Sequence, residues 1–91
     1  MDLNDFRRQM DEIDQGLVGL FERRMDLSAQ IGLYKMENNL PVYDPAREQQ
    51  KLKELAGKVK EGREPGLIAL YTLLFELSRS EQEGILNRKG G

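Results

Sequence analysis

The N-terminal third of the chain holds one long apolar seam, which limits what the chain can fold into. From Leu3 to Tyr34, apolar side chains recur at alternating steps of three and four residues, with no proline among them. This spacing predicts a long α-helix whose narrow apolar stripe packs along another helix. The stripe consists of Leu3, Phe6, Met10, Ile13, Leu17, Leu20, Leu27, Ile31 and Tyr34.

The predicted helix is longer than a compact domain of this chain. Asp2 is the candidate N-cap, and Asn38, Asn39 and Pro41 favour an end nearby, so the helix should cover about 3–37. At ~1.5 Å per residue it would be ~52 Å long, whereas a compact domain of this size is roughly 30 Å across. We therefore expect an all-α fold in which a second copy covers the seam, forming an intertwined helical homodimer.

Two shorter helices are predicted in the rest of the chain. Asp44 and Pro45 have the residue types of an N-cap and a first helical position, and they begin a helix over about 44–60. A third helix is predicted over about 65–86, and residues 87–91 are expected to form a disordered tail. All 91 residues should therefore belong to a single three-helix domain.

Composition excludes several classes of function. The chain has no cysteine and no histidine, so disulfides, the usual zinc sites and Ser-His or Cys-His nucleophile pairs are excluded. A net charge of -2 argues against a nucleic-acid partner. The acidic start resembles no signal peptide, and no apolar run reaches transmembrane length. We expect a cytoplasmic location, no membrane contact, no metal and no cofactor.

One residue interrupts the apolar seam with a charge. Arg24 stands where an apolar residue is due, and Lys35 follows eleven residues later, about three turns or roughly 16 Å along the same face. Ser28 lies between them. Charge beside an apolar face is costly unless an opposite charge meets it. The partner can be a bound anion, or Arg24 can fix the helix register by pairing with Asp14 of a second copy.

A second arginine on the same helix lies too far away to share a small ligand. Arg7 is seventeen residues before Arg24, about 25 Å along the axis. It could reach the same anion only if two long helices pair antiparallel, so that Arg7 of one copy lies opposite Arg24 of the other. Otherwise Arg7 is a surface charge.

The later helices offer further polar groups for such a site. The start of the second helix would bring Arg47 and Glu48 over the end of the first helix. The third helix would add Ser78 and Gln82 to the same site. Each also has a purely structural interpretation. Asp44 can be only a cap, Arg47 a surface charge, and Ser78 and Gln82 polar residues at the border of an apolar face. Spacing by itself supports an anion site in a helical dimer and no more.

The motifs, taken in order, resemble a known family. The matching pieces cover residues 5–86 and comprise Arg7 with Ile13-Asp14, LFERR at 20–24, IGLYK at 31–35, PVYDPARE at 41–48, and FELS at 75–78 with Gln82. Their order and spacing, with the three-helix layout, resemble the all-helical class of chorismate mutase. That domain stands alone or at the N-terminus of bifunctional enzymes of phenylalanine and tyrosine synthesis. The resemblance implies chorismate as substrate and a homodimer as the functional unit.

The resemblance also implies a set of substrate-binding residues. They are Arg7, Arg24, Lys35, Asp44, Arg47, Glu48, Ser78 and Gln82. By resemblance, Arg7 is contributed to the partner's site, where Arg24 and Arg47 join it in binding the two substrate carboxylates. Ser78 lies near one carboxylate, and Ser28 stands at a position that varies in the family.

Four of these residues are expected to be catalytic: Lys35, Gln82, Arg24 and Glu48. The resemblance implies that Lys35 and Gln82 hydrogen-bond the ether oxygen of the breaking C–O bond. Glu48 binds the ring hydroxyl, helped by the backbone at Asp44. Conversion of chorismate to prephenate is an intramolecular rearrangement that needs no nucleophile, metal or organic cofactor. A chain without histidine or cysteine can therefore catalyse it by conformational restriction and electrostatic stabilisation.

Two other functions remain open at this point. An isochorismate-pyruvate lyase with the same fold would bind its substrate with the same basic residues. A non-catalytic helical dimerisation or regulatory module would have no reason to keep Lys35, Glu48 and Gln82 together. A dehydratase or dehydrogenase domain, fused or associated, is a possible partner.

Overall fold

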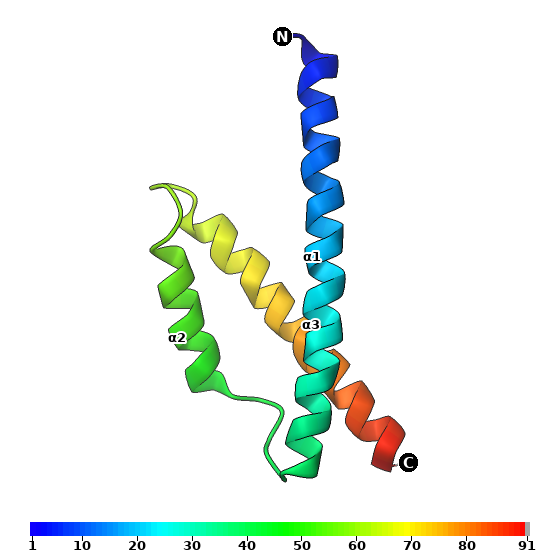
Figure 1. Cartoon of the computed structure of the whole chain (residues 1–91). Coiled ribbons are helices and arrows are strands. Elements are labelled where there is room, and N and C mark those ends of the chain that lie inside the picture. Colours follow the sequence, from blue (N-terminus) through cyan, green and yellow to red (C-terminus); the bar gives the residue numbers. More distant parts are fainter. Residues whose placement is uncertain (91) are drawn as a thin grey trace.

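The computed structural model describes residues 1–90, and the side chains of residues 1–85. The chain folds into three helices, α1 (Leu3–Glu37), α2 (Pro45–Ala56) and α3 (Glu64–Gly90) (Figure 1). The predicted all-α class with three helices is confirmed, and α1 has the predicted bounds. No helix within the described residues has both the length and the apolar character needed to cross a membrane.

The length of α1 is fixed by local interactions at its two ends. The Asp2 carboxylate accepts a hydrogen bond from the Asp5 backbone, and the Asp5 carboxylate accepts one from the Asp2 backbone. This capping box satisfies backbone donors that the first turn leaves free. At the other end the Asn38 backbone donates to Tyr34, and Asn39 takes a left-handed conformation with φ of 57°, which asparagine tolerates well. Between these ends the helix is unbroken for 35 residues.

The second helix is shorter than predicted. Asp44 is its N-cap, as expected, and accepts a hydrogen bond from the Arg47 backbone at 3.1 Å. The helix ends at Ala56 rather than at residue 60, because Gly57 forms the C-cap. Glycine stabilises a helix poorly and often stands just beyond a helix end, so the charged residues that follow it form the connection to α3.

The third helix is longer than predicted. It begins at Glu64 and continues to Gly90, four residues past the predicted end at residue 86. The predicted disordered tail over 87–91 is therefore wrong for the backbone of its first four residues, while Gly91 lies outside the described residues. The physical reason is that the sequence after residue 86 has no proline or glycine until Gly90, so nothing in it breaks a helix.

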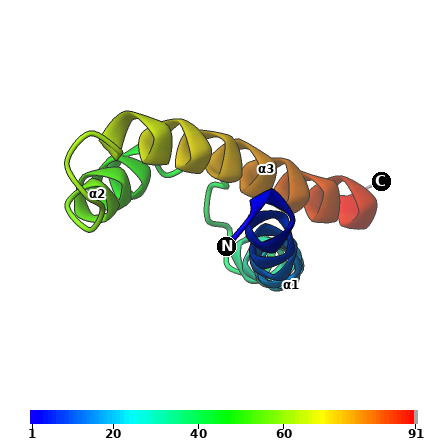
Figure 2. The ribbon, with the colours of Figure 1, turned by 90° about the horizontal axis from the view of Figure 1, so that it is seen from above.

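The helix α3 packs against both of the others. Figure 2 shows α1 and α2 on one side of α3, with α2 along the first half of α3 and α1 across its second half. At the crossing with α1, Gly32 lies so close to α3 that an added Cβ would be 2.8 Å from the Cα of Gln82. Both residues are buried. A glycine is therefore required at position 32 for the two backbones to approach this closely.

We expect Gly32→Ala to destabilise the fold. Alanine usually stabilises a helix interior by about 1 kcal/mol relative to glycine, but here its methyl group would overlap the backbone of α3. Overpacking of this kind costs roughly 1–3 kcal/mol, measurable by urea unfolding. Gly66→Ala is the matched control, because an added Cβ there meets nothing within 4 Å. Equal stability of the two variants would show that the close helix crossing is absent.

The side chains that the structure describes, those of residues 1–85, form no apolar core in a single chain. Its radius of gyration is 16.6 Å and its extents are 54 × 26 × 14 Å, whereas a compact chain of this length would have a radius near ~12 Å. No apolar side chain among the described residues is buried, and the nine residues of the predicted seam are 40–61% exposed. The N-terminal turns of α1 extend past the other helices (Figure 1). A long apolar stripe, interrupted by Arg24, therefore faces solvent, as such surfaces do on chains that bind a partner.

Candidate active site

A cavity of about 570 Å³ is lined by residues of all three helices and of the connection between α1 and α2. This volume is in the range of sites for small ligands. Seven of the eight predicted site residues line it, namely Arg24, Lys35, Asp44, Arg47, Glu48, Ser78 and Gln82. The fold thus gathers residues from positions 24 to 82 around one space, which spacing on a single helix could not establish.

The cavity is strongly cationic in a chain that is slightly acidic overall. The chain has a net charge of -2, yet the side chains around the cavity include five cations and two carboxylates. The cations are Arg24, Lys35, Arg47, Lys51 and Arg79, and the carboxylates are Asp44 and Glu48. A concave site with this excess concentrates small anions.

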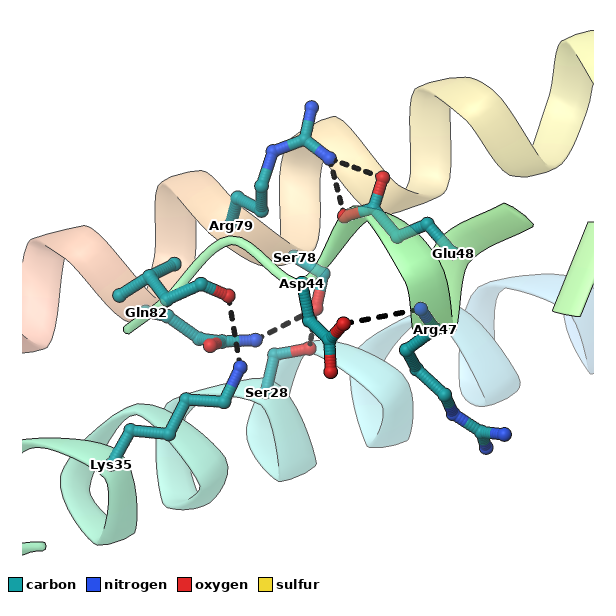
Figure 3. A network of polar contacts seen from close by, with 9 residues as sticks. Ser28, Lys35, Asp44, Arg47, Glu48, Ser78, Arg79 and Gln82 are labelled. Carbon is teal, nitrogen blue, oxygen red and sulfur yellow. Dashed lines mark hydrogen bonds and ion pairs between the residues drawn. The ribbon is translucent and has the colours of Figure 1, made fainter. Parts of the chain in front are cut away.

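Lys35 is anchored at the edge of the cavity. Its ammonium donates a hydrogen bond to the backbone carbonyl of Val42 at 2.9 Å, because the connection after α1 turns back over the helix end. An ammonium has three N–H donors, so two remain for a ligand. Figure 3 shows the Lys35 ammonium and the Gln82 amide directed toward the same space.

Gln82 and two serines form a polar group, largely shielded from solvent, where α1 meets α3. Ser28 and Gln82 are only 3% and 6% exposed. The Gln82 amide nitrogen donates to the Ser78 hydroxyl at 3.4 Å, and that hydroxyl is hydrogen-bonded to Ser28 (Figure 3). The Gln82 Oε1 atom is buried with no partner among the described side chains. An unpaired buried oxygen is costly. A half-turn of the amide would let this oxygen accept from the Ser78 hydroxyl and would place the two N–H donors where the oxygen now lies.

Ser28 joins this polar group through its hydrogen bond to Ser78, a contact that the sequence did not predict. Ser28 lies between Arg24 and Lys35 in the sequence, and neither the spacing nor the family resemblance predicts a role for it. The available signal was its position four residues after Arg24, which places both on the face of α1 that lines the cavity.

Arg24 is held against aromatic rings of its own chain. Its guanidinium carbon lies 5.5 Å from the centre of the Tyr71 ring and 5.9 Å from that of Phe75, distances at which a cation is attracted to a ring face. It makes no ion pair with any carboxylate in the described part of the chain. The alternative pairing with Asp14 of the partner subunit stays a prediction.

Glu48 is paired with an arginine that the sequence analysis missed. The Nη1 atom of Arg79 lies 2.5 Å from both carboxylate oxygens of Glu48 (Figure 3). Its guanidinium also lies 4.8 Å from the centre of the Tyr43 ring. The hydrogen bond to Glu48 raises the pKa of Arg79 above its usual value. The signal for Arg79 was its position three residues before Gln82, which puts both on one side of α3.

Arg7 is the one predicted site residue that lies away from the cavity. It is exposed near the start of α1, and because that helix is unbroken it stays about 25 Å along the axis from Arg24. Arg47 lines the cavity but is also exposed, at the first turn of α2. One chain therefore supplies every predicted site residue except Arg7.

Comparison with known proteins identifies the family. The family model described as chorismate mutase type II matches residues 6–83. The chain belongs to the chorismate mutase type II family. The resemblance inferred from the motifs is thus confirmed, and the match supports the predicted mutase function in aromatic amino acid synthesis.

Curated relatives of the family extend well beyond this chain. A bifunctional chorismate mutase/prephenate dehydratase of Buchnera aphidicola is 33% identical over 89 residues, which are 96% of this chain and 23% of that protein. A T-protein of Haemophilus influenzae is 41% identical over 46 residues, 50% of this chain and 12% of that protein. A second bifunctional enzyme of this name, from Aquifex aeolicus, is 32% identical over 60 residues, 66% and 17% of the two chains. The chain spans less than a quarter of these relatives' length, and no solved structure matches it significantly.

Proposed function

We propose that the chain rearranges chorismate to prephenate, in a site that two copies of the chain build together. The observation that supports this most strongly is the cationic cavity, which brings Arg24, Lys35, Arg47 and Gln82 together in a member of the chorismate mutase type II family. The substrate is a small, flexible dianion. A cavity of about 570 Å³ with an excess of positive charge fits a ligand of that size and charge.

The first task of the site is to hold the substrate in its reactive shape. Arg24 and Arg47, with Arg7 of the partner subunit, bind the two carboxylates, and Ser78 lies near one of them. A planar guanidinium binds a carboxylate through two parallel hydrogen bonds, so it fixes orientation as well as position. Holding the two reacting parts of one molecule together in this way removes much of the entropic barrier.

The second task is to stabilise the charge that develops during the reaction. Negative charge builds on the ether oxygen as the C–O bond breaks, and Lys35 and Gln82 donate hydrogen bonds to it. Anchoring to Val42 holds the Lys35 ammonium in place with two donors free, and Gln82 has a second N–H beside the one directed at Ser78. Donors fixed before the reaction begins contribute most to catalysis.

Glu48 and the backbone at Asp44 bind the ring hydroxyl of the substrate. Both residues line the cavity at the start of α2. The Asp44 carboxylate caps that helix, which supports a role for its backbone rather than its side chain.

The proposed homodimer accounts for two features that a single chain leaves unexplained. The seam of α1 is 40–61% exposed although it is apolar, and an antiparallel second copy would cover it. The same pairing would bring Arg7 of the partner subunit to the cavity. Burial of that seam supplies the free energy for association.

We extend the proposal to the step that follows. Two relatives are named as bifunctional chorismate mutase/prephenate dehydratases, so we propose a dehydratase or dehydrogenase domain, fused or associated, that consumes the prephenate. The cytoplasmic location stays a prediction.

An assay with two substrates tests the proposed reaction. The purified chain is incubated separately with chorismate and with isochorismate, and products are separated by liquid chromatography. We expect loss of chorismate, formation of prephenate and no release of pyruvate. Pyruvate from isochorismate without prephenate from chorismate would establish the lyase instead. Consumption of neither substrate by a folded dimer would establish a non-catalytic module.

A further inference from the structure

Arg79 and Glu48 form the ion pair that joins α3 to α2 beside the cavity. One nitrogen, Nη1 of Arg79, donates to both carboxylate oxygens at 2.5 Å, and the ring of Tyr43 lies 4.8 Å from the guanidinium carbon. The two side chains are 26% and 21% exposed, so water screens this pair less than it screens a fully exposed one. Arg79 is thus held by Tyr43 as well as by Glu48.

Glu48 shares the cavity with three cations that pair with no carboxylate among residues 1–85. Arg24, Lys35 and Arg47 make no ion pair with the carboxylates described. At short range, opposite charges in a partly buried site attract strongly. A Glu48 side chain without its partner could therefore turn toward one of these cations and reduce the positive charge available to an anionic ligand. The pairing with Arg79 removes that competition.

We infer that Arg79 is a positioning residue that holds Glu48 against α3, ready for the substrate's ring hydroxyl and apart from the cations that bind its carboxylates. This role rests on the proposed function, because it needs a substrate with both kinds of group. A carboxylate can bond Arg79 and a hydroxyl at once, since each oxygen has a second lone pair. An arginine is charged at every working pH, and the hydrogen bond to Glu48 raises the pKa of Arg79 further.

Steady-state kinetics on a double-mutant cycle test this role. We expect Arg79→Ala to raise the KM for chorismate about tenfold and to leave kcat within about threefold, because it disturbs substrate binding more than the transition state. Glu48→Gln removes the charge that Arg79 holds. In that background, Arg79→Ala is expected to change kcat/KM by less than about twofold, since a coupled pair gives non-additive effects.

Further variants separate positioning from folding. Arg79→Lys should recover most of the affinity, because a single nitrogen makes both hydrogen bonds to Glu48 and an ammonium can replace it. Arg79→Met keeps the stem that packs at Tyr43, so it should show the same rise in KM even if the alanine variant is unstable. Arg63→Ala is the matched control: it removes one exposed arginine outside the cavity and should leave both constants unchanged.

Three results would overturn the inference. They are an unchanged KM in Arg79→Ala, an equal loss in the Glu48→Gln background, and, in Arg79→Met, a fall in kcat that parallels a lower melting temperature without a rise in KM. An equal loss in that background would mean that Arg79 contacts the substrate directly. Failure of the wild-type chain to consume chorismate would instead overturn the proposed function, so the two failures are distinguishable.

Discussion

Lys35→Ala is expected to slow the rearrangement of chorismate by about 10²–10³-fold, equivalent to ~2.7–4 kcal/mol, the usual effect of removing one preorganised donor. The loss should appear mainly in kcat, because the hydrogen bond to the ether oxygen strengthens only as the C–O bond breaks. The measurement is the initial rate of chorismate disappearance at saturating substrate.

The fold should survive this substitution. Lys35 contributes one hydrogen bond, to the Val42 carbonyl, and the α1 backbone does not depend on it, so helicity and melting temperature should change little. Lys53→Ala is the matched control, since Lys53 is exposed in the last turn of α2 and does not line the cavity. A Lys35→Ala enzyme with nearly wild-type kcat would show that another group stabilises the ether oxygen.

Mixing two inactive variants is expected to restore activity. Arg7→Ala and Lys35→Ala homodimers should each be nearly inactive, because every site lacks one essential cation. In a mixed dimer, one site combines the intact Lys35 of one chain with the intact Arg7 of the other. Random exchange of equal amounts makes half of the dimers mixed, so recovery should reach about a quarter of wild-type activity.

The control for this experiment is a pair of variants that cannot complement. Lys35→Ala and Arg24→Ala change residues that one chain contributes to the same cavity. Every site in their mixed dimer therefore lacks one of the two. This mixture should stay inactive under conditions in which subunit exchange is verified by labelled chains. Absence of recovery with Arg7→Ala and Lys35→Ala, despite exchange, would show that the site is not shared.

Much of the fold could be predicted because its determinants are local. The bounds of α1 follow from the capping box at Asp2 and the asparagines at 38 and 39, all readable from neighbouring residues. The start of α2 follows from Asp44 and Pro45 for the same reason. The gathering of distant residues around one cavity was predicted less from spacing than from the family resemblance, since no spacing rule orients one helix against another.

What the sequence did not predict depends on contacts between helices. The pair of Glu48 with Arg79 joins residues 31 positions apart, and either side chain alone resembles a surface charge. From the sequence alone, Gly32 is only a residue that lowers the stability of a helix. Its role in the close approach of α1 and α3 depends on Gln82, which lies against it. Burial of Ser28 arises from the same crossing. In each case the contacting residue lies on a different helix. The periodicity of one helix does not indicate which residues of another helix it contacts.

The most direct test of the account is to measure mass and activity together as the protein is diluted. Sedimentation equilibrium gives the mass of the species in solution, and chorismate turnover is measured over the same concentrations. We predict twice the 10.5 kDa mass of one chain wherever the enzyme is active, with specific activity falling as dimers dissociate. A 10.5 kDa species that keeps full specific activity would contradict a site built by two chains.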